Sequence, residues 1–169
     1  RPLQTKISNR VLWAIAIVAL AGAVALGVIG AFEVSLWLLA FVAFGGFIVV
    51  AYNLELFRGL LHSDLWFALA WGAFPAVTAY FAQTATVRLE AVLVSAACLF
   101  LSAAQRRLST PVRELRRRVV SVEGRLVLRD GTEIAVNEGT LRRAPEGALR
   151  TLSLALPLLA AGLAVARLS

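Results

Sequence analysis

A short polar stretch between two apolar segments holds the side chains best suited to chemistry. It spans residues 52–64 and contains Tyr52, Asn53, Glu55, Arg58, His62 and Asp64. An arginine can bind a phosphate through two parallel hydrogen bonds, a histidine can relay protons near neutral pH, and carboxylates can hold a divalent cation. The simpler alternatives are solvated loop residues for the charged side chains and His62, and interfacial anchors for Tyr52 and Asn53.

Metal sites of the usual spacing are not found in the sequence. Cys98 is the only cysteine, and it lies in an apolar run, so we expect it to be a small packing residue. The apolar segments carry no charged residue near their middle, which argues against proton pumps, voltage sensors and ion-coupled transporters. These patterns alone assign no residue a catalytic or metal-binding role.

The composition requires an apolar solvent around much of the chain. Hydrophobic residues make up 60% of the 169 residues and the mean hydropathy is +0.80, whereas roughly half apolar is typical of a soluble domain. The net charge of +7 comes from basic residues clustered between apolar runs. Anionic lipid headgroups are therefore the expected partners of this charge, and nucleic acid is not.

Five apolar segments are long enough, or nearly so, to cross a bilayer. They are residues 11–32, 36–54, 65–81, 89–104 and 152–166. We therefore predict an all-α membrane protein, with about five transmembrane helices in a bundle. It divides into a four-helix transmembrane region (1–105), a basic segment (106–150) and a fifth transmembrane helix (151–169).

Details within these segments lead to further expectations. Small residues, among them Gly27, Gly45 and Gly46, allow close packing between helices. Pro75 removes a backbone donor and should kink the third helix. The fifth helix can begin before residue 152, near Pro145, as an amphipathic helix that enters the membrane.

The arginines predict the orientation of the chain. Residues 106–150 hold 11 arginines against six acidic residues, and Lys6 and Arg10 precede the first span. By the positive-inside rule the N-terminus, the 55–64 loop and the 106–150 segment are cytoplasmic. The expected location is the bacterial inner membrane.

The basic segment shows local signals of its own. Ser109, Thr110 and Pro111 predict the start of a short basic helix over residues 112–118, suited to a membrane surface. Its arginine run at 116–118 can bind phospholipid headgroups or a diphosphate, or can serve as a topology signal. Strand-like runs follow at 119–122, 125–129 and 132–136, with a turn at Asp130-Gly131, so we predict a small cytoplasmic β-hairpin or three-stranded meander.

Two segments resemble the UbiA-type membrane prenyltransferases. Residues 1–8, RPLQTKIS, resemble the stretch that follows the first aspartate-rich motif of that family, with Lys6 where a glycine is usual. Residues 52–84 resemble its fourth-to-fifth-helix junction, including GAFPAVTAY at residues 72–80. The resemblance covers about residues 1–105. It implies a diphosphate pocket lined by Tyr52, Asn53, Arg58 and Asp64, with Arg58 as an approximate stand-in because Leu56 occupies the usual basic position.

The chain departs from this family where metal ligands are needed. Family members hold Mg²⁺ and a prenyl diphosphate between two aspartate motifs and have nine helices. The first motif would precede Arg1, and residues 105–114 replace the second motif with QRRLSTPVRE, which has a single acid. Two hypotheses follow: a non-catalytic lipid- or isoprenoid-binding or structural subunit of a membrane complex, or part of a Mg²⁺-dependent prenyltransferase acting on an aromatic acceptor.

Overall fold

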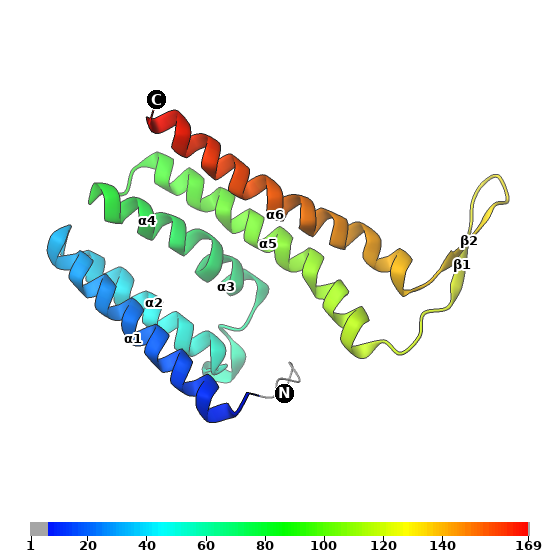
Figure 1. Ribbon diagram of the computed structural model, residues 1–169, viewed down its shortest axis with the longest axis horizontal. Coiled ribbons are helices and arrows are strands. Elements are labelled where there is room, and N and C mark those ends of the chain that lie inside the picture. Colours follow the sequence, from blue (N-terminus) through cyan, green and yellow to red (C-terminus); the bar gives the residue numbers. More distant parts are fainter. Residues whose placement is uncertain (1–6, 169) are drawn as a thin grey trace. The chain divides into compact units, whose positions relative to one another are not determined.

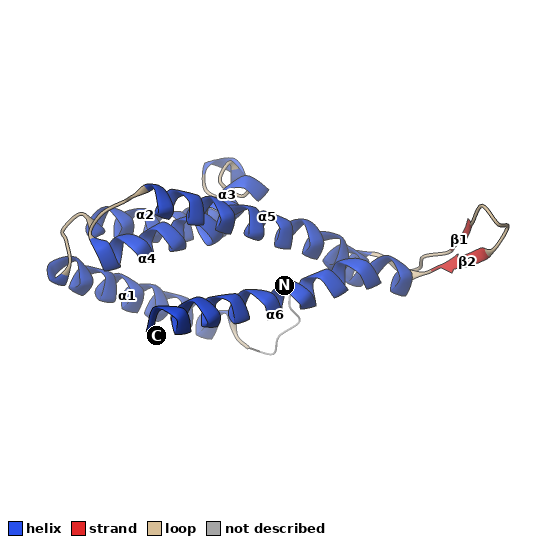
Figure 2. Cartoon of the chain, turned by 90° about the horizontal axis from the view of Figure 1, so that it is seen from above, coloured by secondary structure: helices blue, strands red, loops and turns tan. Residues whose placement is uncertain are grey.

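The computed structural model describes residues 7–168. The letters RPLQTK of the UbiA-like stretch RPLQTKIS therefore lie outside the described residues. Figure 2 shows the helical character of the chain and its single pair of strands. The helices are α1 (Asn9–Glu33), α2 (Leu38–Asn53), α3 (Asp64–Ala68), α4 (Phe74–Thr84), α5 (Leu89–Arg118) and α6 (Glu138–Leu168). The strands are β1 (Gly124–Val127) and β2 (Glu133–Val136), as Figure 1 shows. The chain forms two compact units, residues 1–102 and 103–169.

Four helical segments are long and apolar enough to cross a membrane. They are α1, the continuous run Asp64–Thr84, α5 and α6. The fifth apolar helix, α2, has 16 residues and a length of about 24 Å, which is short of a ~30 Å hydrocarbon core. The structure therefore confirms the predicted helical architecture, with one segment shorter than expected.

The first unit is organised around α2. The hydroxyl of Ser8 accepts a hydrogen bond from the Val11 N–H and caps α1. A short turn leads to α2, which packs along α1 on one side and against α4 on another. Two small buried clusters hold these helices together: one is Ile48, Ala51, Leu61 and Ala70, and the other is Ala31, Leu38 and Phe81.

Pro75 changes the helix before it. The residues Leu69–Ala73 form a π-helical turn between α3 and α4, and the Phe74 N–H donates to the Leu69 carbonyl five residues earlier. Pro75 has no N–H, so an α-helical bond to the Trp71 carbonyl cannot form. The sequence predicted a kink at Pro75. The structure has instead a π-helical turn just before Pro75, which adds one residue to a single turn of a continuous helical run.

In the second unit, the helix predicted to start at Pro111 does not exist as a separate element. Instead α5 runs without a break from Leu89 to Arg118, past the end predicted at residue 104. Pro111 deprives only the Arg107 carbonyl of its helical donor, and water can hydrate that group at this polar part of the helix. The neighbouring hydroxyls are satisfied locally, because Ser109 donates to the Arg106 carbonyl and Thr110 accepts from Arg113.

The predicted meander is a two-stranded hairpin. The strands β1 and β2 pair antiparallel with Leu126 opposite Ile134, but residues 119–122 form no strand. Val120 is fully exposed, so this strand-like run has neither a pairing edge nor a surface to cover. Leu128 donates to the Thr132 carbonyl and accepts from the Gly131 N–H, which closes a three-residue loop with Gly131 at a φ of 85°.

We predict that acid loosens this hairpin loop. The Thr132 N–H donates to the Asp130 carboxylate at 3.0 Å, and this hydrogen bond holds the pKa of Asp130 below its ordinary value of 3.8. A lowered pKa means that the carboxylate stabilises the folded turn above pH 3.8, and that this contribution is lost as the pH falls through the lowered pKa. The amide shift of Thr132 in an NMR titration should follow this loss. A titration that looks the same in Asp130→Asn would contradict the assignment.

The last helix begins earlier than the predicted span at residues 152–166. Asn137 precedes it and forms a reciprocal cap, because the Thr140 N–H donates to Asn137 Oδ1 (3.0 Å) and the Asn137 N–H donates to Thr140 Oγ1 (2.9 Å). The helix passes through Pro145 and Pro157 without interruption. A polar first part and an apolar second part therefore belong to one helix.

Removing this cap should fray the start of α6. The substitution Asn137→Ala is expected to destabilise the first helical turn by about 1 kcal/mol, because the Thr140 N–H loses its acceptor, Asn137 Oδ1. Hydrogen exchange of the amides at residues 138–141 should become faster. Asn137→Ser retains an acceptor and is the matched control; equal exchange in the two variants would show that the cap has no stabilising role.

Candidate functional site

The predicted polar loop separates into a buried end and an exposed end. Tyr52 is buried, with 7% of its surface exposed, in the last turn of α2. Asn53 is exposed and its amide donates to the Val49 carbonyl (2.8 Å), which fixes it at the end of the same helix. Arg58 and Asp64 are also exposed, and Asp64 is the first residue of α3 after the capping residue Ser63.

An aromatic cluster surrounds Tyr52. Its ring centroid lies 4.4 Å from that of His62 and 4.5 Å from that of Trp71, and Phe67 stacks on Trp71 at 5.5 Å. His62 Nδ1 lies 3.2 Å from the Tyr52 carbonyl oxygen, a hydrogen bond that requires the proton on Nδ1. His62 therefore closes the end of α2, which is a structural alternative to the proton relay considered above.

The loop that carries Arg58 has an unusual backbone. Glu55, Phe57 and Arg58 all have φ between 50° and 58°, and Arg58 lies in the 3-10 turn Phe57–Gly59. Non-glycine residues in this region are strained by about 1–3 kcal/mol each, so the surroundings must hold them. The hydrogen bond from Leu56 N–H to the Ala51 carbonyl (3.0 Å) and the burial of Leu61 do so.

The turn thereby holds the backbone of Arg58 and leaves its side chain exposed to solvent. Among residues 7–168 it makes no hydrogen bond or ion pair. Its guanidinium remains available to a phosphate or a carboxylate, the groups that arginine binds with two parallel hydrogen bonds. The carboxylates of Glu55 and Asp64 are not part of a metal site, because residues 7–168 contain no group of three His, Cys, Asp or Glu side chains that could hold a metal ion.

An apolar pocket lies between α1, α2 and the helical run 64–84. Its cavity measures about 430 Å³, within the range of small-molecule sites in proteins. Sixteen residues line it. The polar side-chain groups among them are the hydroxyl of Thr78 and the indole N–H of Trp71. The Thr78 hydroxyl already donates to the Phe74 carbonyl (2.7 Å), so the lining offers a ligand almost no unsatisfied polar group.

Glycines create this pocket. Gly45 approaches the Phe74 ring so closely that a Cβ there would lie 3.2 Å from it, whereas a Cβ at Gly46 would meet nothing within 4 Å. The sequence predicted a close contact or a slight bend at Gly45 and Gly46, and the structure has a close contact at Gly45 but not at Gly46. The sequence did not predict that Phe67 and Trp71 belong to the aromatic cluster around Tyr52. Their spacing of four residues on an apolar helix could have indicated a shared aromatic face.

Trp71 connects the pocket to the aromatic cluster. Its side chain lines the cavity and its ring also contacts Tyr52. The site is thus apolar along its length and ends at aromatic rings next to a polar loop. Such an arrangement can accept a long apolar chain with a polar group at one end.

Comparisons with protein-family models, with curated proteins and with solved structures find no significant match to this chain.

Proposed function

We propose that this chain is a multi-pass membrane protein that binds a long-chain lipid of isoprenoid type, without catalysing prenyl transfer itself. The observation that carries the proposal is the apolar pocket of about 430 Å³ that ends at the cluster of Tyr52, His62 and Trp71. The four long apolar helices support the membrane assignment. The resemblance of residues 1–105 to UbiA-type proteins supports an isoprenoid over other lipids.

The polar loop supplies the recognition of the lipid's head. Arg58 would contact an anionic head group, Tyr52 would border it at the pocket end, and Asn53 and Asp64 would flank the loop. The chain lacks the second aspartate motif of the family, so the lipid would be held rather than cleaved.

Membrane lipids and the other subunits of a membrane complex are the expected partners. The N-terminus and the 106–150 segment would be on the cytoplasmic side of a bacterial inner membrane.

The experiment measures thermal unfolding of the purified chain with two ligands, a long prenyl alcohol and the matching prenyl diphosphate, each with and without Mg²⁺. A ligand that binds only the native state at a hundredfold excess over its Kd stabilises that state by about 2.7 kcal/mol. Stabilisation by both ligands, independent of Mg²⁺, is the expected result. Stabilisation by the diphosphate alone, and only with Mg²⁺, would favour the prenyltransferase hypothesis, and no stabilisation by either ligand would refute the proposal.

A further inference from the structure

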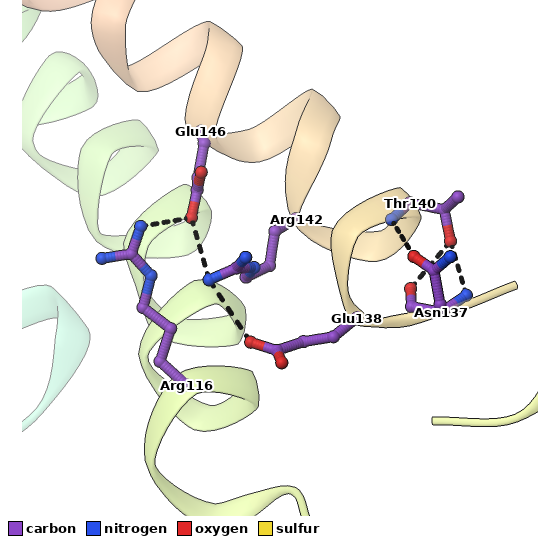
Figure 3. Close-up of polar contacts among 6 residues, drawn as sticks. All are labelled: Arg116, Asn137, Glu138, Thr140, Arg142 and Glu146. Atoms are coloured by element: carbon purple, nitrogen blue, oxygen red, sulfur yellow. Dashed lines mark hydrogen bonds and ion pairs between the residues drawn. The ribbon is translucent and has the colours of Figure 1, made fainter. Parts of the chain in front are cut away.

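The part of the second unit that follows the apolar run of α5 forms a charged stalk, defined here as residues 106–118 of α5 and 138–150 of α6. Glu146 accepts from Arg116 at 2.7 Å and lies 3.8 Å from Arg142, which also pairs with Glu138 at 3.3 Å. Figure 3 shows these side chains converging from the two helices. The Arg116–Glu146 pair joins α5 to α6, whereas the two pairs of Arg142 lie within α6.

The remaining arginines of this segment have no carboxylate partner within residues 7–168. Within the stalk they are Arg107, Arg113, Arg117, Arg118, Arg143 and Arg150. Arg113 and Arg117 are one helical turn apart, and both are exposed, so they share one face of α5. The stalk therefore carries an excess of positive charge, and part of that excess lies on one exposed face of α5.

We propose that this arginine face binds an acidic segment of a partner protein in the aqueous phase. The inference rests on the assignment of α5 as a membrane-spanning helix, but not on the lipid site. It replaces the expectation that these arginines lie on a membrane surface.

The continuity of α5 places Arg117 beyond the reach of the lipid headgroups, whereas Arg113 lies past the headgroup layer but within one Debye length of it. The apolar run of α5 ends at Ala104, and at 1.5 Å per residue Arg113 and Arg117 follow about 14 Å and about 20 Å farther along the axis. A typical tilt of about 20° shortens these heights by less than a tenth. The headgroup layer adds only about 5–8 Å to each side of the hydrocarbon core, and the Debye length is about 8 Å. Arg106 and Arg107 can reach headgroups, whereas Arg117 cannot.

The chemistry of the surface favours an acidic protein over nucleic acid. No aromatic residue occurs in residues 101–169, so the stalk and the hairpin offer no ring on which an unpaired base could stack. The hairpin instead exposes an apolar cross-strand pair, Leu126 and Ile134, which are 57% and 43% exposed. Guanidinium groups on the exposed face of α5 fit the carboxylates of an acidic peptide.

The test uses the full chain in nanodiscs of zwitterionic phospholipid and a fluorescein-labelled oligoglutamate peptide as the probe. The double variant Arg113→Gln/Arg117→Gln is compared with Arg125→Gln/Arg129→Gln, which removes the same charge from the hairpin. We expect the first variant to weaken peptide binding by on the order of tenfold and the second by less than about twofold. Equal losses would show that only net charge matters and would overturn the proposal.

Two further arms separate the alternative partners. Peptide binding should persist when phosphatidylserine is added to the nanodiscs, and its loss would mean that lipid headgroups occupy the arginines. An oligonucleotide of equal charge should bind more weakly than the peptide; tighter binding that the first variant abolishes would assign the surface to nucleic acid. Thermal stabilisation by the prenyl alcohol should be unchanged in both variants, so failure here and failure of the lipid site are distinguishable.

Discussion

Replacing Gly72 with alanine is expected to destabilise the first unit more than the same change at its other glycines. A Cβ at this position would lie 2.6 Å from the backbone oxygen of Cys98 and 2.8 Å from the Ser102 Cβ. A backbone oxygen cannot rotate away, so α5 must move as a whole. Small residues allow two helices to approach this closely, and overpacking such a contact costs about 1–3 kcal/mol.

Two other glycines provide graded controls for this prediction. A Cβ at Gly27 would lie 2.5 Å from the Val42 Cγ2, but that side chain can change its rotamer, so Gly27→Ala should lower the free energy of unfolding less. A Cβ at Gly46 would meet nothing within 4 Å, so Gly46→Ala should leave stability unchanged or raise it slightly. Unfolding midpoints in detergent should fall in the order Gly46→Ala, Gly27→Ala, Gly72→Ala. Equal midpoints for the three variants would refute the close contact at Gly72.

Hydropathy predicts most of the helices because each apolar run carries its own signal. Residues 11–32 lie within α1, and residues 65–81 lie within the run Asp64–Thr84, where Pro75 marks the irregular turn. The Asp130-Gly131 pair likewise predicts a hairpin from local backbone preferences. Local rules succeed at these positions because no distant contact competes with them.

Local rules fail where two of them conflict or where a partner is needed. At Pro111 a helix-start signal and a continuous helical sequence compete, and the structure has one helix because a single lost hydrogen bond is less costly than two new helix ends. At residues 119–122 the strand signal is real, but a strand requires a pairing edge. The last helix was expected to begin before residue 152, near Pro145, and it begins earlier still, at Glu138, because an asparagine cap outside the apolar run sets its start.

The pocket depends on contacts that a single sequence does not encode locally. Its lining comes from three helical segments, and residues as far apart as Leu20 and Thr78 contribute to it. The candidate residues Tyr52 and Arg58 were identified from their types, yet the structure places Tyr52 as the buried member of an aromatic cluster and Arg58 on an exposed strained turn.

Filling the pocket from Gly46 is expected to abolish lipid binding while the fold is retained. Gly46 lines the cavity, and its Cβ direction is open, so the ring of Gly46→Phe would occupy space that the lipid needs without a backbone clash. Gly22→Phe is the matched control, because its Cβ also meets nothing within 4 Å and Gly22 does not line the pocket. Both substitutions remove a helical glycine, so their effects on helix propensity are the same.

The readout of this pair separates occupancy of the pocket from general membrane affinity. The prenyl alcohol should stabilise wild type and Gly22→Phe by about 2.7 kcal/mol at a hundredfold excess over its Kd, and should leave Gly46→Phe unchanged. A ligand that merely partitions into detergent would stabilise all three alike, because an added phenyl ring does not alter the outer surface of the helices enough to exclude it. Only displacement from this pocket predicts loss at Gly46 and retention at Gly22, so equal stabilisation of the two variants would place the lipid outside this pocket.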